Sequence, residues 1–428
     1  MAALTSSGIF ATFILRFNIS GIGAVLVQPQ SDFHLTKLQL GLIFTAFLVP
    51  YTVLQPIAGW ATDRFGAKLT LLVGTLAASI ITITTGFVSS FFALISLRAI
   101  LGLTQAPNFV SGAKVSSSDW YDHGQRAKSA STWIAGGRLG TAITIPLATT
   151  LAVVYGWRWG FYITGLIGLL WCVAWLVVFR EEPTIARIHK AHDQESTQSG
   201  IRTAMPVIAS SLGLGLVLAS FGQGYLAYLL GNWLPTYLGA EGFTVVNAGL
   251  LSFLPIIAAV LTIILIGGLL SDHLAVSRGS LVSLRSGLFA LGMLGASGML
   301  VLTAYASQIA QQLHVSGGYF ALFSLTIAGA MWGMATPSLW VALIEAVPKE
   351  SVGAVGGVQN LGGNAGGIAV SLLTGYFVGT TNTFFLAILL TCGMTMTAAV
   401  SALVLIKPRR QDLKLLGPIL SGTALENP

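Results

Sequence analysis

Charged residues are scarce in this chain: Asp, Glu, Lys and Arg make up 8% of its 428 residues, whereas hydrophobic residues make up 54%. A soluble globular domain carries about 25% charged residues. The composition therefore excludes an ordinary soluble enzyme or binding domain, and nearly all of the chain must face lipid or other apolar helices. Glycine is abundant, with 50 residues, which suits close helix packing in a membrane.

Cysteine is nearly absent, and its two occurrences, Cys172 and Cys392, lie in apolar runs, where a disulfide framework is not expected. The six histidines fall at or near the ends of apolar runs. The sequence displays neither a cluster of metal ligands nor a nucleophile beside a base. We therefore expect no metal, no cofactor and no enzymatic reaction.

Long apolar runs are what the chain has in excess. Runs of about 20 residues, the length that crosses a bilayer, recur twelve times, six on each side of the longest polar stretch. This predicts an all-α membrane protein with twelve transmembrane helices in two six-helix halves. We expect the N-terminal half at 1–179, a cytoplasmic linker at 180–204, the C-terminal half at 205–406 and a cytoplasmic tail at 407–428.

Basic residues gather in alternate connectors, among which we count Arg285, whereas the opposite connectors hold only Lys37 and Arg158. The positive-inside rule then places both termini on the cytoplasmic side of the cytoplasmic (inner) membrane. The net charge of +7 is a signal of orientation and of contact with lipid headgroups, so we do not expect nucleic-acid binding.

Three arginines, Arg16, Arg98 and Arg138, lie inside apolar runs, whereas all acidic residues fall at or near loops or termini. An arginine at bilayer depth costs about 2.5–3.5 kcal/mol on insertion scales. Such charges need a counter-charge, and a bound anion would supply it. The alternative is hydrogen bonding to backbone carbonyls or amides, with Gln55 and Gln105 as neutral partners. For Arg138, snorkelling toward the membrane surface is an equally open alternative.

A short motif recurs at the end of the second helix of two three-helix groups. GWATDRFGAK contains Asp63, Arg64 and Lys68, and GLLSDH contains Asp272. The first copy resembles the signature loop of the major facilitator superfamily, a transporter fold with inverted three-helix repeats and a central substrate site. The resemblance covers the whole chain and implies a conformational gate at these residues. Glu345, which ends the tenth run, is interpreted as a further gate or helix-end residue.

Four stretches resemble the anion:cation symporter family, which includes galactonate, glucarate, hexuronate, phthalate and sialin-like carriers. They are YTVLQPIAG at 51–59, RAILGLTQAP at 98–107, GNWLPTYL at 231–238, and PK at 348–349 followed by GAVGGVQNLGGNAGGI at 353–368. The resemblance implies that Arg16 and Arg98 line an anion site. It also implies that Tyr51, Trp340 and Asn360 contact the substrate.

Two further residues of the seventh run, Tyr228 and Asn232, are one helical turn apart and share a face. Their hydroxyl and amide groups suit the polar groups of a sugar acid. Hydrogen bonding between helices is the alternative.

Two positions depart from the proton-coupled members of that family, which carry an acid just before the first arginine and a glutamate seven residues after the second. Leu15 and Gln105 occupy these positions here. Gln105 lies two turns from Arg98 and faces the same side, but a glutamine cannot take up a proton. The usual proton-coupling carboxylates are therefore missing.

We expect a monomeric secondary transporter of a small organic anion, a sugar acid or other carboxylate, in which the resemblance implies symport with a proton or another cation. A facilitative carrier, an exchanger or an exporter would not require the missing carboxylates. A drug:proton antiporter on the same fold is a further alternative, although the arginines would repel cationic drugs. A non-transporting membrane receptor or scaffold is the last.

Overall fold

The fold is known from a computed structural model. It describes residues 2–29, 31, 33–117, 126–178, 204–270, 281–347 and 351–407. Within these ranges ten helices are long and apolar enough to cross a membrane. Two further crossings come from the consecutive helices α2 and α3 and from α5, which carries Arg98. The all-α prediction of twelve crossing segments is confirmed. Asp272, the predicted linker at 180–203 and the tail from 408 lie outside the described residues.

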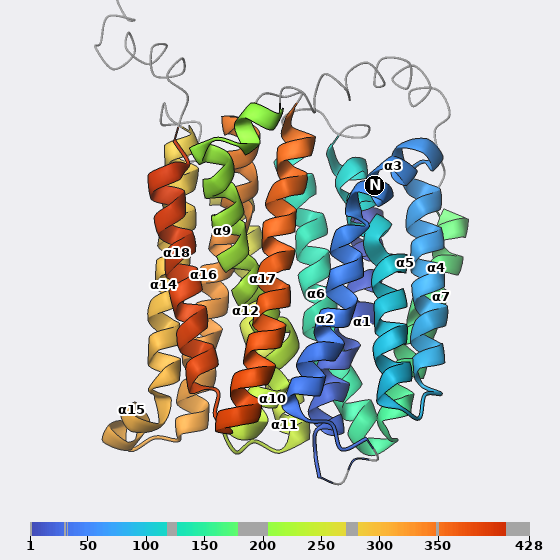
Figure 1. The fold of residues 1–428 in the computed structure, drawn as a ribbon, viewed down its shortest axis with the longest axis vertical. Helices are drawn as coiled ribbons and strands as arrows, with labels where there is room; N and C mark the ends of the chain where they lie inside the picture. The colour runs from blue at the N-terminus through green and yellow to red at the C-terminus, as the bar shows by residue number, and fades with distance from the viewer. Residues whose placement is uncertain are drawn as a thin grey trace, which may run out of the picture.

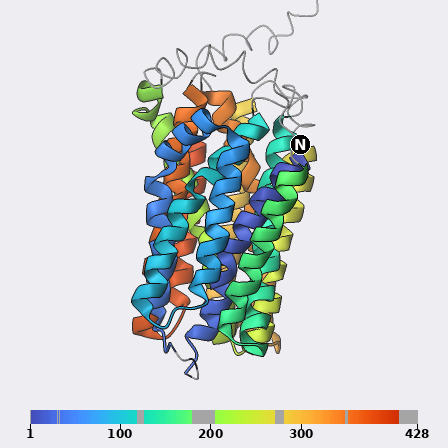
Figure 2. The same ribbon diagram turned by 90° about the vertical axis from the view of Figure 1, so that its right-hand side faces the viewer.

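The helices form two groups that lie mainly on opposite sides of the molecule (Figures 1 and 2). The N-terminal group consists of α1 (Ala2–Leu26), α2 (Lys37–Val53), α3 (Gln55–Phe65), α4 (Ala67–Thr85), α5 (Phe91–Ser117), α6 (Arg126–Val154) and α7 (Trp157–Val178). The C-terminal group consists of α9 (Ser211–Tyr228), the π-helix η2 (Leu229–Trp233), α10 (Leu234–Ala240), α11 (Val245–Leu251), α12 (Phe253–Thr262), the π-helix η3 (Ile263–Leu270), α14 (Leu281–Ala304), α15 (Ala306–Leu313), α16 (Gly317–Ala346), α17 (Val352–Thr381) and α18 (Phe385–Leu405).

Two of the crossing segments are interrupted near mid-depth, where prolines remove backbone donors. Pro56 occupies the first turn of α3, and the chain changes from α2 to α3 at Leu54. Pro235 cannot donate to the carbonyl of Gly231, and the π-helix η2 precedes it. Short π-helical insertions are frequent at functional sites. The two interruptions lie next to Gln55 and Tyr228, which places both side chains at breaks rather than in uniform helix.

The face at which α1 begins and α18 ends is called the terminal face below, and it is uppermost in Figure 1. Near the opposite face the two groups pack closely against glycines. A Cβ added to Gly41 of α2 would collide with the Ser371 carbonyl of α17, and one added to Gly249 of α11 would collide with Thr149 of α6. Glycines allow this approach because they have no side chain.

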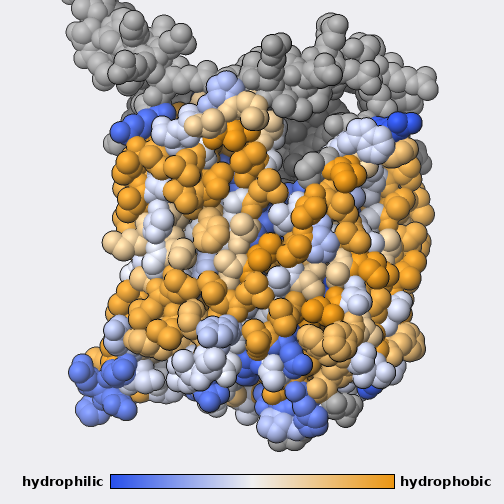
Figure 3. All heavy atoms as spheres, viewed as in Figure 1, coloured by the Kyte–Doolittle hydropathy of each residue, from blue (hydrophilic) through white to orange (hydrophobic). Residues whose placement is uncertain are grey.

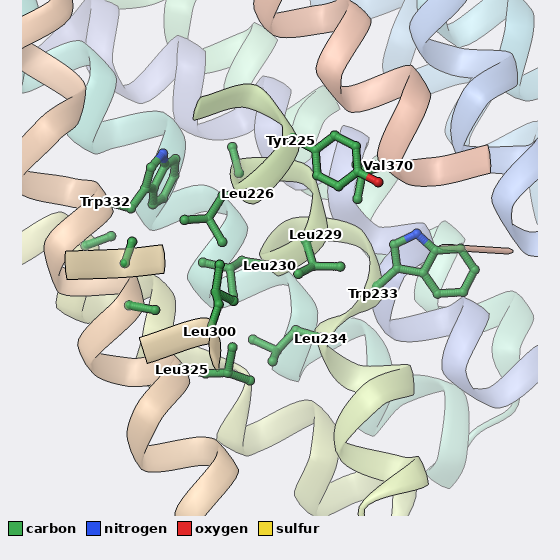
Figure 4. Packing of buried hydrophobic residues seen from close by; sticks show 14 of the residues in the cluster. Tyr225, Leu226, Leu229, Leu230, Trp233, Leu234, Leu300, Leu325, Trp332 and Val370 are labelled. Atoms are coloured by element: carbon green, nitrogen blue, oxygen red, sulfur yellow. The ribbon is translucent and has the colours of Figure 1, made fainter. Parts of the chain in front are cut away.

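Apolar residues cover the visible outer surface as a broad belt between two more hydrophilic ends (Figure 3). Inside the C-terminal group, aromatic and leucine side chains pack tightly (Figure 4). Tyr225, Trp233 and Trp332 are almost completely buried there. The belt is the surface that faces lipid in a membrane protein.

Candidate functional site

Helix α1 is held by side chains that donate to its backbone carbonyls. The amide of Gln105 donates to the Thr12 carbonyl at 3.3 Å, and Arg98 Nη2 donates to the Arg16 carbonyl at 2.8 Å. Both donors come from α5, which confirms that they share a face. From α6, the Thr144 hydroxyl donates to the Ile14 carbonyl at 3.2 Å. These three bonds fix the segment of α1 that carries the Arg16 side chain.

The guanidinium of Arg16 lies in an aromatic enclosure at mid-depth. Its carbon atom is 4.6 Å from the ring centres of Phe47 and Tyr51, both on α2, and 5.2 Å from that of Tyr228 on α9. Arg16 Nη2 also donates a hydrogen bond to the Tyr228 hydroxyl. Arg16 is only 6% exposed, so it is a buried cation that joins the N-terminal group to the C-terminal group.

Polar groups of α17 continue this contact. The Tyr228 hydroxyl donates to Asn364 Oδ1 at 3.4 Å. Nearer the terminal face, Asn360 Nδ2 donates to Gln55 Oε1 at 2.8 Å, which is a second hydrogen bond between the two groups. The structure therefore brings the predicted Tyr51, Gln55, Tyr228 and Asn360 together with Arg16 along one inter-group surface.

Arg138 of α6 makes a third contact between the groups. Its guanidinium carbon lies 4.5 Å from the ring centre of Trp332 on α16. Arg138 is also close enough to Arg16 and Tyr228 to interact with them electrostatically. The sequence reasoning missed Trp332 and selected Trp340, two turns further along the same helix. Trp340 lies over Gly356 of α17, where an added Cβ would be 3.4 Å from its ring.

Asn232 and Tyr228 share a face, as predicted, and that face is turned toward α17, but the two residues have different partners there. Asn232 Nδ2 donates to the Ser371 hydroxyl at 3.3 Å, nearer the opposite face. Both residues belong to the C-terminal group, so this bond joins helices within one group. The geometry agrees with the structural alternative for Asn232.

The acidic residues are remote from Arg16, Arg98 and Arg138, which are called the arginine cluster below. Among the described residues they are Asp63, Glu241 and Glu345, and each lies at or within two residues of a helix end. Burial raises the pKa of the Glu241 carboxyl, and a hydrogen bond from Tyr237 opposes that rise. Leu15, at the position of the missing acid, is fully buried in an apolar cluster.

Glu345 Oε1 lies 3.7 Å from Nε of Arg285. We counted Arg285 among the connector cations, and that placement is wrong: the residue lies inside α14 and is only 3% exposed. The hydrophobic helix α14 begins four residues before Arg285, so the Arg285 side chain is buried in the helix bundle. Glu345 supplies its counter-charge there. This ion pair lies within the C-terminal group and does not join the two groups.

The other predicted gate residues lie at the junction of α3 and α4. Arg64 is exposed, with its guanidinium carbon 5.5 Å from the ring centre of Trp60. The Lys68 carbonyl accepts a hydrogen bond from Trp175 at 3.4 Å. Asp63 lies in the last turn of α3.

The central cluster offers cations and hydrogen-bond donors to a ligand. Among the described residues there is no group of His, Cys, Asp or Glu that could hold a metal ion. Buried donor atoms without a partner in the described residues include Gln55 Nε2, Arg98 Nε, Trp332 Nε1 and Asn364 Nδ2. Anions are the ligands that such a set of groups can satisfy.

Comparison with known proteins gives consistent matches over nearly the whole chain. The family described as the Major Facilitator Superfamily matches residues 8–371. The chain is similar to a hexuronate transporter of Bacillus subtilis (strain 168), with 28% identity over 93% of this chain and 91% of that protein. It is similar to a D-galactonate transporter of Escherichia coli O6:H1, with 27% identity over 87% and 88%. The crystal structure of a D-xylose-proton symporter shares the fold, with a TM-score of 0.72, 16% identity and 95% and 98% coverage.

Proposed function

The chain belongs to the Major Facilitator Superfamily of membrane transporters, and we propose on that premise that it is a secondary transporter of an organic anion, a sugar acid or other carboxylate. The observation that carries this proposal is the buried Arg16 guanidinium, enclosed by aromatic rings and bonded to Tyr228 across the two helix groups. The names of the hexuronate and D-galactonate transporters support the same substrate class.

Arg16 binds the carboxylate in this proposal. A guanidinium matches a carboxylate with two parallel hydrogen bonds, and the enclosure keeps water away from them. Arg98 acts through Arg16, because it donates to the Arg16 carbonyl and holds that part of α1 in place. Tyr51, Gln55, Tyr228, Asn360 and Asn364 surround the remainder of the molecule, and Gln55 and Asn364 each retain an unpartnered amide nitrogen that can donate to substrate oxygens.

Alternating access follows from the contacts between the two groups, which we propose to move as the halves 1–179 and 205–406. Close contacts at Gly41, with the Ser371 carbonyl, and at Gly249, with the Thr149 side chain, close the opposite face. Toward the terminal face the two groups are joined by the hydrogen bond between Gln55 and Asn360, which is easier to break than the close packing at the opposite face. Breaking it would open a path from the site to the terminal face. We propose that the terminal face is cytoplasmic, that the protein works as a monomer in the inner membrane, and that Asp63, Arg64 and Lys68 complete its gate.

Coupling is where the chain differs from a standard proton symporter. Leu15 is packed in the apolar interior and Gln105 is engaged by the α1 backbone, so neither position offers a titrating group. Anion import against an inside-negative potential costs about 2.3 kcal/mol per charge per 100 mV. The missing carboxylates therefore favour a second candidate, an exchanger or facilitative carrier of organic anions, beside the symport that the family implies. The arginine cluster disfavours a drug:proton antiporter, because it repels cationic drugs.

Binding of sugar acids to the purified protein tests the proposal. D-galactonate and D-glucuronate should raise its melting temperature, because a ligand of the native state stabilises it. Arg16→Gln should weaken this binding by about 100-fold, because truncating one partner of a buried charge pair costs about 2–5 kcal/mol. Arg158→Gln is the matched control: it removes the same charge at the start of α7, remote from the cluster. Equal affinity of Arg16→Gln and the native protein would overturn the site.

A further inference from the structure

Arg138 and Trp332 form a pair that the anion site described above does not use. We propose that they bind a second anionic group, so that the substrate is a dianion held by Arg16 at one end and by Arg138 and Trp332 at the other. This inference rests on the proposed function and adds a substrate class to it. The relatives differ in this respect: hexuronate and galactonate, which two of them are named for, carry a single carboxylate, whereas galactarate and D-glucarate, which another is named for, carry two.

The balance of charges among the described residues is the first observation that supports a second anionic group. Arg138 lies 12 residues into the 29-residue helix α6, between Gly137, which packs on Ile9, and Gly140, which packs on Phe10, so its backbone is nearer the terminal face than that of Arg16. The two side chains are still close enough to interact electrostatically. The described acidic residues all lie at helix ends. Trp332 stabilises the Arg138 charge through its ring, but a cation–π contact is weaker than the cost of burying the charge. A monoanion at Arg16 leaves Arg138 uncompensated, whereas a second anionic group compensates it.

The second observation is a buried hydrogen-bond donor without a partner in the described residues. The indole Nε1 of Trp332 is buried, Trp332 is 1% exposed, and this atom has no hydrogen-bond partner among the described residues. Figure 4 shows this nitrogen turned away from Leu300 and Leu325. An indole N–H can only donate. The Arg138 guanidinium and the indole together therefore suit a group rich in acceptor oxygens, a carboxylate or a sulfonate.

The third observation is that Arg138 and Trp332 lie on different helix groups. Arg138 belongs to the N-terminal group and Trp332 to the C-terminal group, as Arg16 and Tyr228 do. A dianion bound at both pairs bridges the groups twice. A monoanion reaches only one of the pairs and gives less of the binding energy that draws the groups together.

Two matched pairs of acids test the inference by calorimetric titration of the purified protein. Galactarate and galactonate have the same carbon chain and differ only by a second carboxylate. Sulfoacetate and acetate differ by a sulfonate, which separates the two possible second groups. In at least one pair the native protein should bind the dianion about tenfold or more tightly than the monoanion, because a charged hydrogen bond is lost with the second group.

Three variants locate the second group. Arg138→Gln should weaken dianion binding about tenfold or more and change monoanion binding by less than about threefold. Arg138→Lys should restore much of the preference, because it keeps the charge. Trp332→Phe keeps an aromatic ring, although a smaller one, and removes the N–H. It should lower the preference for the dianion by about threefold, and it tests the inference independently if Arg138→Gln does not fold.

Three results would overturn the inference. One is a native protein that binds both members of each pair equally. Another is an Arg138→Gln or Trp332→Phe variant that folds and retains the full preference. The last is equal weakening of both members by both variants, which indicates a structural pair. In all three cases binding that depends on Arg16 leaves the proposed function standing, whereas failure of every acid to bind overturns the function and the inference together.

Discussion

The two helix groups bring opposite chemistry to one site. The N-terminal group supplies the cations Arg16, Arg98 and Arg138, and the C-terminal group supplies neutral partners such as Tyr228 and Trp332. The charged side is held rigidly, because donors from α5 and α6 fix the carbonyls of α1. The neutral side makes contacts that do not include an ion pair between the groups in the described residues.

This difference has a consequence for motion. Separating two opposite charges in a medium of low dielectric is costly. Separating a cation from an aromatic ring or a hydroxyl costs less free energy. The two groups can therefore move apart without breaking an ion pair at the described interface, while the charges travel with one group. In the function that we propose, the bound anion, rather than a side chain of the other group, neutralises these charges.

The largest expected effect on energy coupling comes from adding a carboxylate to the cationic side. Gln105→Glu places a titrating group where the Gln105 amide now donates to the Thr12 carbonyl. The protonated acid can make that bond and the carboxylate cannot, so proton uptake becomes linked to the position of α1. Accumulation of a sugar acid in proteoliposomes should then gain about tenfold per unit of pH gradient for one coupled proton.

The control for this variant is Gln28→Glu, which adds the same acid near the other end of α1. We expect transport by the native protein to depend only weakly on a pH gradient, and Gln28→Glu should leave that dependence unchanged. Strong proton symport by the native protein would contradict the argument from Leu15 and Gln105. So would a Gln105→Glu variant that transports actively but ignores the gradient.

A smaller effect is expected on the neutral side. Tyr228→Phe removes the hydroxyl that accepts from Arg16 and donates to Asn364 and leaves the ring over Arg16. Affinity for the organic anion should fall by about tenfold, because a hydrogen bond to a charged group is worth about 1.5–3 kcal/mol. Tyr225→Phe is matched to it, one turn earlier on α9, where the hydroxyl is buried without a partner in the described residues. Calorimetric titration of both variants should separate them, and equal affinities would remove Tyr228 from the site.

The division into charged and neutral sides was only partly predictable. Twelve apolar runs predict the helices because length and hydropathy suffice for a membrane span. Arg16, Tyr51, Tyr228 and Asn360 were selected from polar residues in apolar surroundings and from the family resemblance. The structure places them together, since such side chains must find partners inside the bundle.

The contacts that could not be predicted from the sequence depend on how each helix is rotated about its own axis. Helix α16 is apolar all round, so periodicity does not say which of its tryptophans faces the centre. Trp332, not Trp340, meets Arg138. Hydrogen bonding of Arg98 to a backbone carbonyl is the alternative to anion binding that we considered from the sequence, but no residue pattern identifies the Arg16 carbonyl as the acceptor. Arg285 was misplaced because it lies close to the start of an apolar run, where a connector and a helix look alike.

The smallest effect is expected for Asn232, which tests where the neutral side of the site ends. Its amide donates to Ser371 within the C-terminal group, and an average hydrogen bond between membrane helices contributes about 0.6 kcal/mol. Asn232→Ala should therefore lower stability by about that amount and change substrate affinity by less than about twofold. Thermal unfolding and titration of the same sample measure the two quantities. Tenfold weaker binding, as expected for Tyr228→Phe, would instead extend the site one helical turn toward the opposite face and make Asn232 a substrate contact.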